Sequence, residues 1–195
     1  MKKFLVVIFV CGFVPFSALA QDAPSLPGPL PVEQTKVSSY SQLKLELPAL
    51  FTGDTFGDGT VGTGLNVIYS YLFRVNDKAF VGPAVELGYN YYGSIYTEDG
   101  SLSLSSLSVL AGIAFFSGED IVYFTCISMG RNTSYLSDGS LTVSHGTMGF
   151  KFTTGMLFHL SKNFQLGFHI GWLEIGMSNE YPSIVLAGLS TGLKF

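Results

Sequence analysis

The amino-acid sequence predicts an all-β protein, an eight-stranded antiparallel up-and-down transmembrane β-barrel. Three observations lead to this fold class. Apolar residues recur at every second position along several segments, which is the period of a strand whose two faces meet different surroundings. The connections between these segments alternate between long and short. Aromatic residues make up 14% of the chain and charged residues only 12%, against about 25% charged residues in soluble domains.

The first 20 residues have the features of a signal peptide. Lys2 and Lys3 precede an apolar run over residues 4–16, and small residues at positions 18 and 20 mark a cleavage site before Gln21. The run is shorter than the roughly 20 residues that a spanning helix needs. Lipidation at Cys11 is disfavoured, because this cysteine lies inside the apolar run. We therefore expect export and exclude residues 1–20 from the fold.

Residues 21–38 are interpreted as a Pro-rich periplasmic leader, and residues 39–195 as the barrel. The four prolines between positions 24 and 31 favour an extended chain without a core of its own. Without the signal peptide, Cys126 is the one remaining cysteine, so no intramolecular disulfide is expected. The net charge of -4, or about -6 once the two lysines of the signal are removed, argues against nucleic acid as a partner.

Five segments alternate clearly between an apolar face and a face of small or polar residues. They are residues 62–73, 81–91, 148–158, 164–172 and 185–195. Three further strands are predicted from weaker patterns. Residues 43–47 alternate but precede Pro48, and residues 102–116 lose their phase at Ser105 and Ser106, as a β-bulge in this strand would cause. Residues 121–130 are apolar on both faces, so their outward face is left unassigned.

The connections indicate the orientation of the barrel. Short connections are expected at residues 74–78, 117–120 and 161–163, and long ones at residues 52–61, 93–101, 131–145 and 177–183. In outer-membrane barrels the short turns lie in the periplasm and the long loops lie outside the cell. Both ends of the barrel domain are therefore expected in the periplasm, and the longest loop, residues 131–145, outside.

The apolar stripe of each strand is expected to face lipid. The opposite stripe holds Gly, Ser, Thr and Ala with few charges, whereas a soluble barrel turns a charged stripe to water. Tyr69, Tyr71 and Phe73 end one strand, and Tyr89 and Tyr91 end the next, where interfacial aromatic girdles are expected.

The last strand carries a more specific pattern. Residues 185–195 alternate up to a terminal Phe195, and this resembles the signal by which the barrel assembly machinery recognises bacterial outer-membrane proteins. Residues 39–195 as a whole resemble the small eight-stranded barrel family that includes outer membrane proteins A, X and W. The resemblance implies residence in the bacterial outer membrane, with its lipid and the assembly machinery as partners. It does not imply one activity, because the activities within this family differ.

A set of charged residues is predicted to face the barrel interior. They are Lys44, Glu46, Glu86, Lys151, His169 and Lys194. An unpaired charge inside a narrow barrel costs several kcal/mol, so we expect these residues to pair with one another. The favoured interpretation is a salt-bridge plug that fills the interior, and the alternative is a gate or a narrow ion path.

No catalytic, cofactor or metal site is predicted. The pattern of His159 and Ser161 with the distant Glu174 is similar to that of the outer-membrane lipid A deacylases. However, Ser161 is expected in a periplasmic turn, so we favour His159 as a polar interior residue. His145 and His169 have no partners at ligand spacing. Cys126 is interpreted as a packed small residue.

The sequence favours a structural or surface-interaction role for a closed or nearly closed barrel. In this interpretation an extracellular ligand contacts the outer loops, chiefly residues 131–145 with Tyr135. The alternative is a narrow channel for small or apolar solutes. It is favoured by the apolar residues expected on the inward face, Ile68, Leu72 and Leu173. A lipid-modifying enzyme is the second alternative. The chain is too short for a sixteen-stranded porin.

Overall fold

The computed structural model describes residues 39–52, 61–97, 100–138, 141–175 and 183–195. The predicted signal peptide and the Pro-rich leader lie outside these residues. The strands are β1 (Ser39–Thr52), β2 (Val61–Arg74), β3 (Ala79–Thr97), β4 (Gly100–Ser117), β5 (Ile121–Ser137), β6 (Thr142–His159), β7 (Phe164–Ile175) and β8 (Ser183–Lys194). Within the described ranges, no helix has the length and apolar character needed to cross a membrane.

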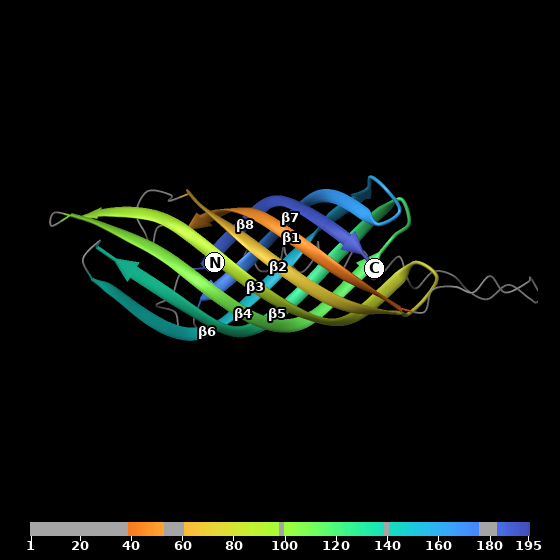
Figure 1. Cartoon of the computed structure of the whole chain (residues 1–195), viewed down its shortest axis with the longest axis horizontal. Helices are drawn as coiled ribbons and strands as arrows, with labels where there is room; N and C mark the ends of the chain where they lie inside the picture. The colour runs from red at the N-terminus through yellow and green to blue at the C-terminus, as the bar shows by residue number, and fades with distance from the viewer. Residues whose placement is uncertain (1–38, 53–60, 98–99, 139–140, 176–182) are drawn as a thin grey trace, which may run out of the picture. The chain divides into compact units, whose positions relative to one another are not determined.

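The eight strands form a closed antiparallel barrel in sequence order (Figure 1). β1 closes the ring by pairing with β8, where Leu45 lies opposite Thr191. The predicted eight-stranded up-and-down barrel is confirmed. Short connections, residues 75–78, 118–120 and 160–163, gather at one end of the barrel, on the right in Figure 1. We call it the turn end, and the opposite end the far end.

The predicted faces of the strands are confirmed. Phe168 is 48% exposed while the adjacent His169 is 1% exposed, as expected for neighbours on opposite sides of a strand. The structure also decides the facing of β5, with Phe124 and Cys126 inside the barrel and Tyr123 outside. The β5 sequence is ambiguous because the interior around Phe124 is itself apolar.

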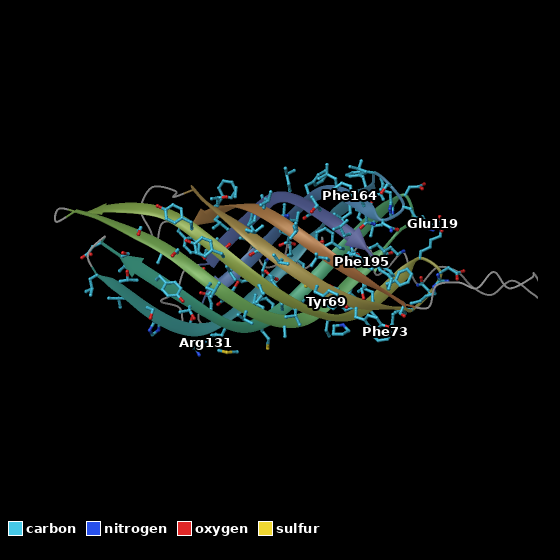
Figure 2. All side chains as sticks on the ribbon, viewed as in Figure 1. Tyr69, Phe73, Glu119, Arg131, Phe164 and Phe195 are labelled. Carbon is cyan, nitrogen blue, oxygen red and sulfur yellow. The ribbon has the colours of Figure 1, made fainter. Side chains whose placement is uncertain are left out.

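An apolar belt covers the outside of the barrel (Figure 2). Near the turn end, the hydroxyl groups of Tyr69 and Tyr71 are hydrogen-bonded to Ser41 and Ser39 at 3.0 and 3.1 Å. Towards the far end, the belt reaches charged residues at outward strand positions, Arg131 beside Met148 and Glu174 beside Phe150. A mainly apolar wall between polar borders is the surface of a barrel that spans a lipid bilayer.

The predicted bulge lies in a different strand. Tyr91 pairs with Ser105 and Gly93 pairs with Leu104, so the extra residue is Tyr92 of β3 and not a residue of β4. Gly93 has a φ of 90°, which is accessible to glycine without strain. The apolar phase of β4 changes for another reason, because Leu104 packs inside the barrel against the buried far-end core.

Two predicted loops are wrong, because most of their residues continue the strands. Residues 93–97 and 100–101 belong to the β3–β4 hairpin, and residues 131–137 and 142–145 belong to the β5–β6 hairpin. β3 to β6 have 17 to 19 residues, whereas β7 and β8 have 12. Beyond the membrane, strands no longer need an apolar outer face. Their sequences are therefore polar and resemble those of loops.

The longer hairpins rise beyond the rest of the barrel at the far end, on the left in Figure 1. The β6–β7 ladder stops at Gly149 and Ile175, and the β2–β3 ladder stops at Thr63 and Tyr91. We call residues 93–97, 100–104, 131–137 and 142–148 the four-strand extension. β6 forms one edge of this sheet, because its described ladder with β7 begins only at Gly149.

Candidate functional site

Four buried charged side chains meet inside the barrel, and we call them the interior charge network. Lys44 and Glu46 come from β1, Glu86 from β3 and Lys151 from β6, and each side chain is at most 2% exposed. The Lys151 Nζ atom donates to Glu46 Oε2 at 2.9 Å and also to Glu86 Oε1. The Lys44 Nζ atom lies 2.9 Å from Glu46 Oε1. Alternation places all four side chains inward, and the barrel curvature brings them together.

The interior charge network is balanced, with two ammonium groups and two carboxylates. Its remaining polar valences are partly met by neighbours, since Ser128 Oγ donates to Glu86 Oε2 at 3.4 Å. The Lys44 ammonium lies 3.4 Å from the centroid of the Phe124 ring, in a cation–π contact. Gly155 makes room for this ring, because a Cβ atom there would lie 2.8 Å from it. Pairing of this kind avoids the cost of an isolated charge in a low-dielectric interior.

His169 lies beside the network without forming an ion pair in the described structure. Its Nδ1 atom is 2.9 Å from Ser190 Oγ, and Ser190 is the ladder partner of Glu46. Its Nε2 atom is buried without a hydrogen-bond partner among the described residues. Lys194 is separate from the network and lies near the turn end, with Nζ 4.1 Å from the centroid of the Tyr40 ring.

Apolar side chains pack on both sides of the network along the barrel. The turn-end core contains Tyr40, Ile68, Leu72, Phe116, Phe124 and Leu157, among others. The far-end core contains Leu50, Tyr92, Leu173, Ile184 and Leu186, with Leu104 against it. On β1 the inward order from the turn end is Tyr40, Lys44, Glu46 and Leu50, so the charges lie between the two cores. Ile68, Leu72 and Leu173 therefore belong to packed cores rather than to an open apolar passage.

Sequence reasoning did not single out the uncharged polar residues of the interior as contact partners. Gln42 Nε2 donates to Gln165 Oε1 at 2.9 Å across the barrel, and the Tyr92 hydroxyl is hydrogen-bonded to Ser106 at 2.9 Å. Parity places Gln42 and Gln165 inward, but it does not show that they meet. Tyr92 follows the same parity, since it is buried like Asn90 while Tyr91 between them is exposed.

The structure does not assemble His159, Ser161 and Glu174 into a catalytic group. His159 Nε2 lies 3.2 Å from Gln165 Nε2, and Ser161 Oγ accepts a hydrogen bond from the Phe164 backbone at 3.1 Å. Glu174 lies nine residues beyond Gln165 on β7, which corresponds to roughly 30 Å of extended strand. Among the described residues, no three His, Cys, Asp or Glu side chains are grouped as metal ligands.

No protein-family model and no curated protein sequence matches the chain. Solved structures are similar to it in fold. The attachment invasion locus protein Ail of Yersinia pestis, in complex with the heparin analogue sucrose octasulfate, has a TM-score of 0.57 at 16% identity over 82% of this chain and 100% of Ail. Neisserial surface protein A has a TM-score of 0.57 at 17% identity over 81% of this chain and 97% of its own.

A major outer membrane protein from Thermus thermophilus has a TM-score of 0.50 at 13% identity, over 80% of this chain and 99% of its own. At these identities the similarity concerns the fold. The chain thus has the fold of the small outer-membrane β-barrels, together with the apolar outer belt that such a barrel presents to lipid.

Proposed function

We propose that the protein is an integral outer-membrane barrel with a closed interior, which presents the four-strand extension to a partner at the cell surface. The observation that carries this proposal is the contrast between the two parts of the molecule. The interior is filled by the charge network between two apolar cores, whereas four strands rise well beyond the others at one end. The additional strand residues form an exposed sheet rather than a passage, which favours binding of a partner over transport of a solute.

The orientation follows from the connections. The turn end carries short turns and the C-terminal residue, so we place it in the periplasm and the extension outside the cell. The Phe195 backbone N–H donates to the Ser41 carbonyl at 2.9 Å, which continues the β1–β8 seam to the last residue. This geometry fits the proposed role of Phe195 as the assembly signal, because it places that residue at the seam between the first and last strands.

The chemistry of the extension suits an extended segment of a partner protein. The β6–β7 ladder ends at Gly149 and Ile175 among the described residues, so β6 continues beyond it as an edge of the extension, and such edges accept another strand. Val143 on this edge is 57% exposed, and Leu141 beside it is 64% exposed. Arg131 is the one Lys or Arg of the extension, so a polyanionic ligand such as the heparin analogue bound by Ail finds little complementary charge here.

The test is a shortened β5–β6 hairpin. Deleting residues 135–144 leaves Ser134 and His145 to form a two-residue turn above the paired residues Thr133 and Gly146. We expect the shortened barrel to assemble normally. Cells that display it should bind to a panel of immobilised extracellular proteins at least about tenfold more weakly than cells that display the intact barrel. Equal binding of both barrels, or binding only to sulfated glycans, would contradict the proposed partner.

Closure of the interior is tested separately in planar bilayers. The intact barrel should show no sustained single-channel openings, because two apolar cores pack on either side of the paired charge layer. Steady conductance by the wild-type protein would favour the alternative, a narrow channel.

A further inference from the structure

A cavity of about 330 Å³ opens at the turn end of the barrel, away from the four-strand extension. Its wall includes the inward residues Tyr40, Phe80, Phe116 and Val122, which form an apolar floor continuous with the turn-end core. Residues of the turns 75–78 and 118–120 form its rim. The proposed surface role makes no use of this cavity.

Two cations, Arg74 and Lys194, face the cavity from the ends of β2 and β8. The Lys194 Nζ atom lies 4.1 Å from the centroid of Tyr40 and 5.9 Å from that of Phe80. The Arg74 Cζ atom lies 5.5 Å from the Phe80 centroid. Two like charges thus share one aromatic wall.

The Arg74 guanidinium has unused donors. Its Nε and Nη1 atoms are buried and have no hydrogen-bond partner among the described residues. A buried donor without an acceptor costs about 1–3 kcal/mol, and more for a charged group. An oxyanion beside Arg74 would supply these acceptors, and its charge would relieve the repulsion between Arg74 and Lys194.

The carboxylates around the cavity lie on its rim. Glu119 is 67% exposed and pairs with Lys78 at 3.7 Å, and Asp77 and Asp120 are also exposed in the turns. They balance the total charge of the cavity but leave its inner wall cationic and aromatic. A ligand that enters therefore meets a solvated acidic rim first and the two cations next to the apolar floor.

We propose that this cavity binds a small organic carboxylate. The carboxylate accepts hydrogen bonds from Arg74 and pairs with Lys194, while its apolar group lies on Tyr40 and Phe80. The volume suits this class, because ligand pockets measure about 300–1,000 Å³ and combine an apolar lining with a few convergent polar groups. This site is independent of the proposed surface partner, since it lies at the other end of the barrel.

The test is a titration of the protein in phosphatidylcholine nanodiscs, followed by the ¹⁵N-labelled arginine Nε–H signals. The chain contains two arginines, Arg74 and Arg131, so the Arg131 signal at the far end is an internal control. We expect benzoate to shift the Arg74 signal in a saturable manner and to leave that of Arg131 unchanged. Acetate should bind more weakly than benzoate, and benzyl alcohol should not shift the signal.

Variants separate the site from unspecific effects. Lys194→Gln should weaken benzoate binding about tenfold, since it removes one of the two charges that hold the carboxylate. Lys162→Gln, a charge loss in an exposed turn at the same end, should have no effect. A second readout, direct calorimetric binding, is applied to Arg74→Lys, which should bind more weakly than wild type but still bind.

Three results would overturn the proposal. They are a non-saturating shift of Arg74, equal shifts with benzoate and benzyl alcohol, or equal loss of binding in the Lys162→Gln control.

Discussion

The Lys151 Nζ atom on β6 lies 2.9 Å from Glu46 Oε2 on β1, so a single ion pair joins two strands that are not neighbours in the barrel. The same ammonium donates to Glu86 on β3. One side chain thus connects three separate parts of the wall through the interior. These contacts are independent of the backbone ladder, and their contribution to stability can be measured by substitution.

Lys151→Met should destabilise the barrel by about 3–5 kcal/mol, because it leaves two buried carboxylates with Lys44 as their one cation. The measurement is reversible urea unfolding in lipid vesicles. Lys162→Met, which removes an exposed lysine, is the control and should change stability by less than about 0.5 kcal/mol. If the two variants are similarly stable, the interior charge network does not contribute this much to the stability of the barrel.

Coupling within the network is tested by adding Glu86→Gln to Lys151→Met. The double variant should recover part of the loss, because one of the two unpaired carboxylates becomes neutral. A coupling energy of about 0.5–3 kcal/mol is expected from the mutant cycle. Strictly additive effects would contradict a direct interaction between these side chains.

Phe168→Arg should destabilise the barrel by about 2–4 kcal/mol, the cost of arginine near the bilayer midplane on a lipid-facing position. Phe168 is 48% exposed on the outer wall of β7. Phe168→Leu keeps the position apolar and is the matched control. If the two variants have the same free energy of unfolding in vesicles, this face of β7 does not contact lipid.

Gly155→Ala should destabilise the barrel by about 1–3 kcal/mol, because there is no room for a methyl group. Its Cβ atom would clash with the Phe168 carbonyl oxygen and lie 2.8 Å from the Phe124 ring that carries Lys44. Gly146→Ala is the control, since its Cβ would meet the flexible Arg131 side chain at 3.1 Å. Equal urea midpoints for both alanine variants would contradict the predicted clash.

Deletion of Phe195 should reduce the fraction of heat-modifiable, membrane-inserted protein, whereas replacement of the exposed Leu141 by serine should not. Phe195 is 71% exposed and hydrogen-bonded to Ser41 through its backbone, so its loss removes the proposed assembly signal and little buried surface. If the deletion inserts as efficiently as the wild type, the terminal residue is not needed for recognition. N-terminal sequencing of the inserted protein tests the signal peptide as well and should find Gln21 first.

The sequence by itself determined the number of strands, their antiparallel order and the face of most residues. Alternation carries this information because a strand places successive side chains on opposite sides, and a lipid-facing wall excludes charge. It also placed Lys44, Glu46, Glu86 and Lys151 on inward positions. Alternation could not assign the outward face of the strand over residues 121–130, because both of its faces are apolar.

Only the tertiary structure decided which inward charges meet. Parity assigns a side but not a height, so Lys194 was grouped with residues from which the barrel separates it. The height of each residue depends on the stagger of the strands and on the Tyr92 bulge, which are properties of the closed ring. The extension was missed for a related reason. Residues 131–137 and 142–148 are paired through their backbones but need no lipid-facing side, so their side chains show no apolar period.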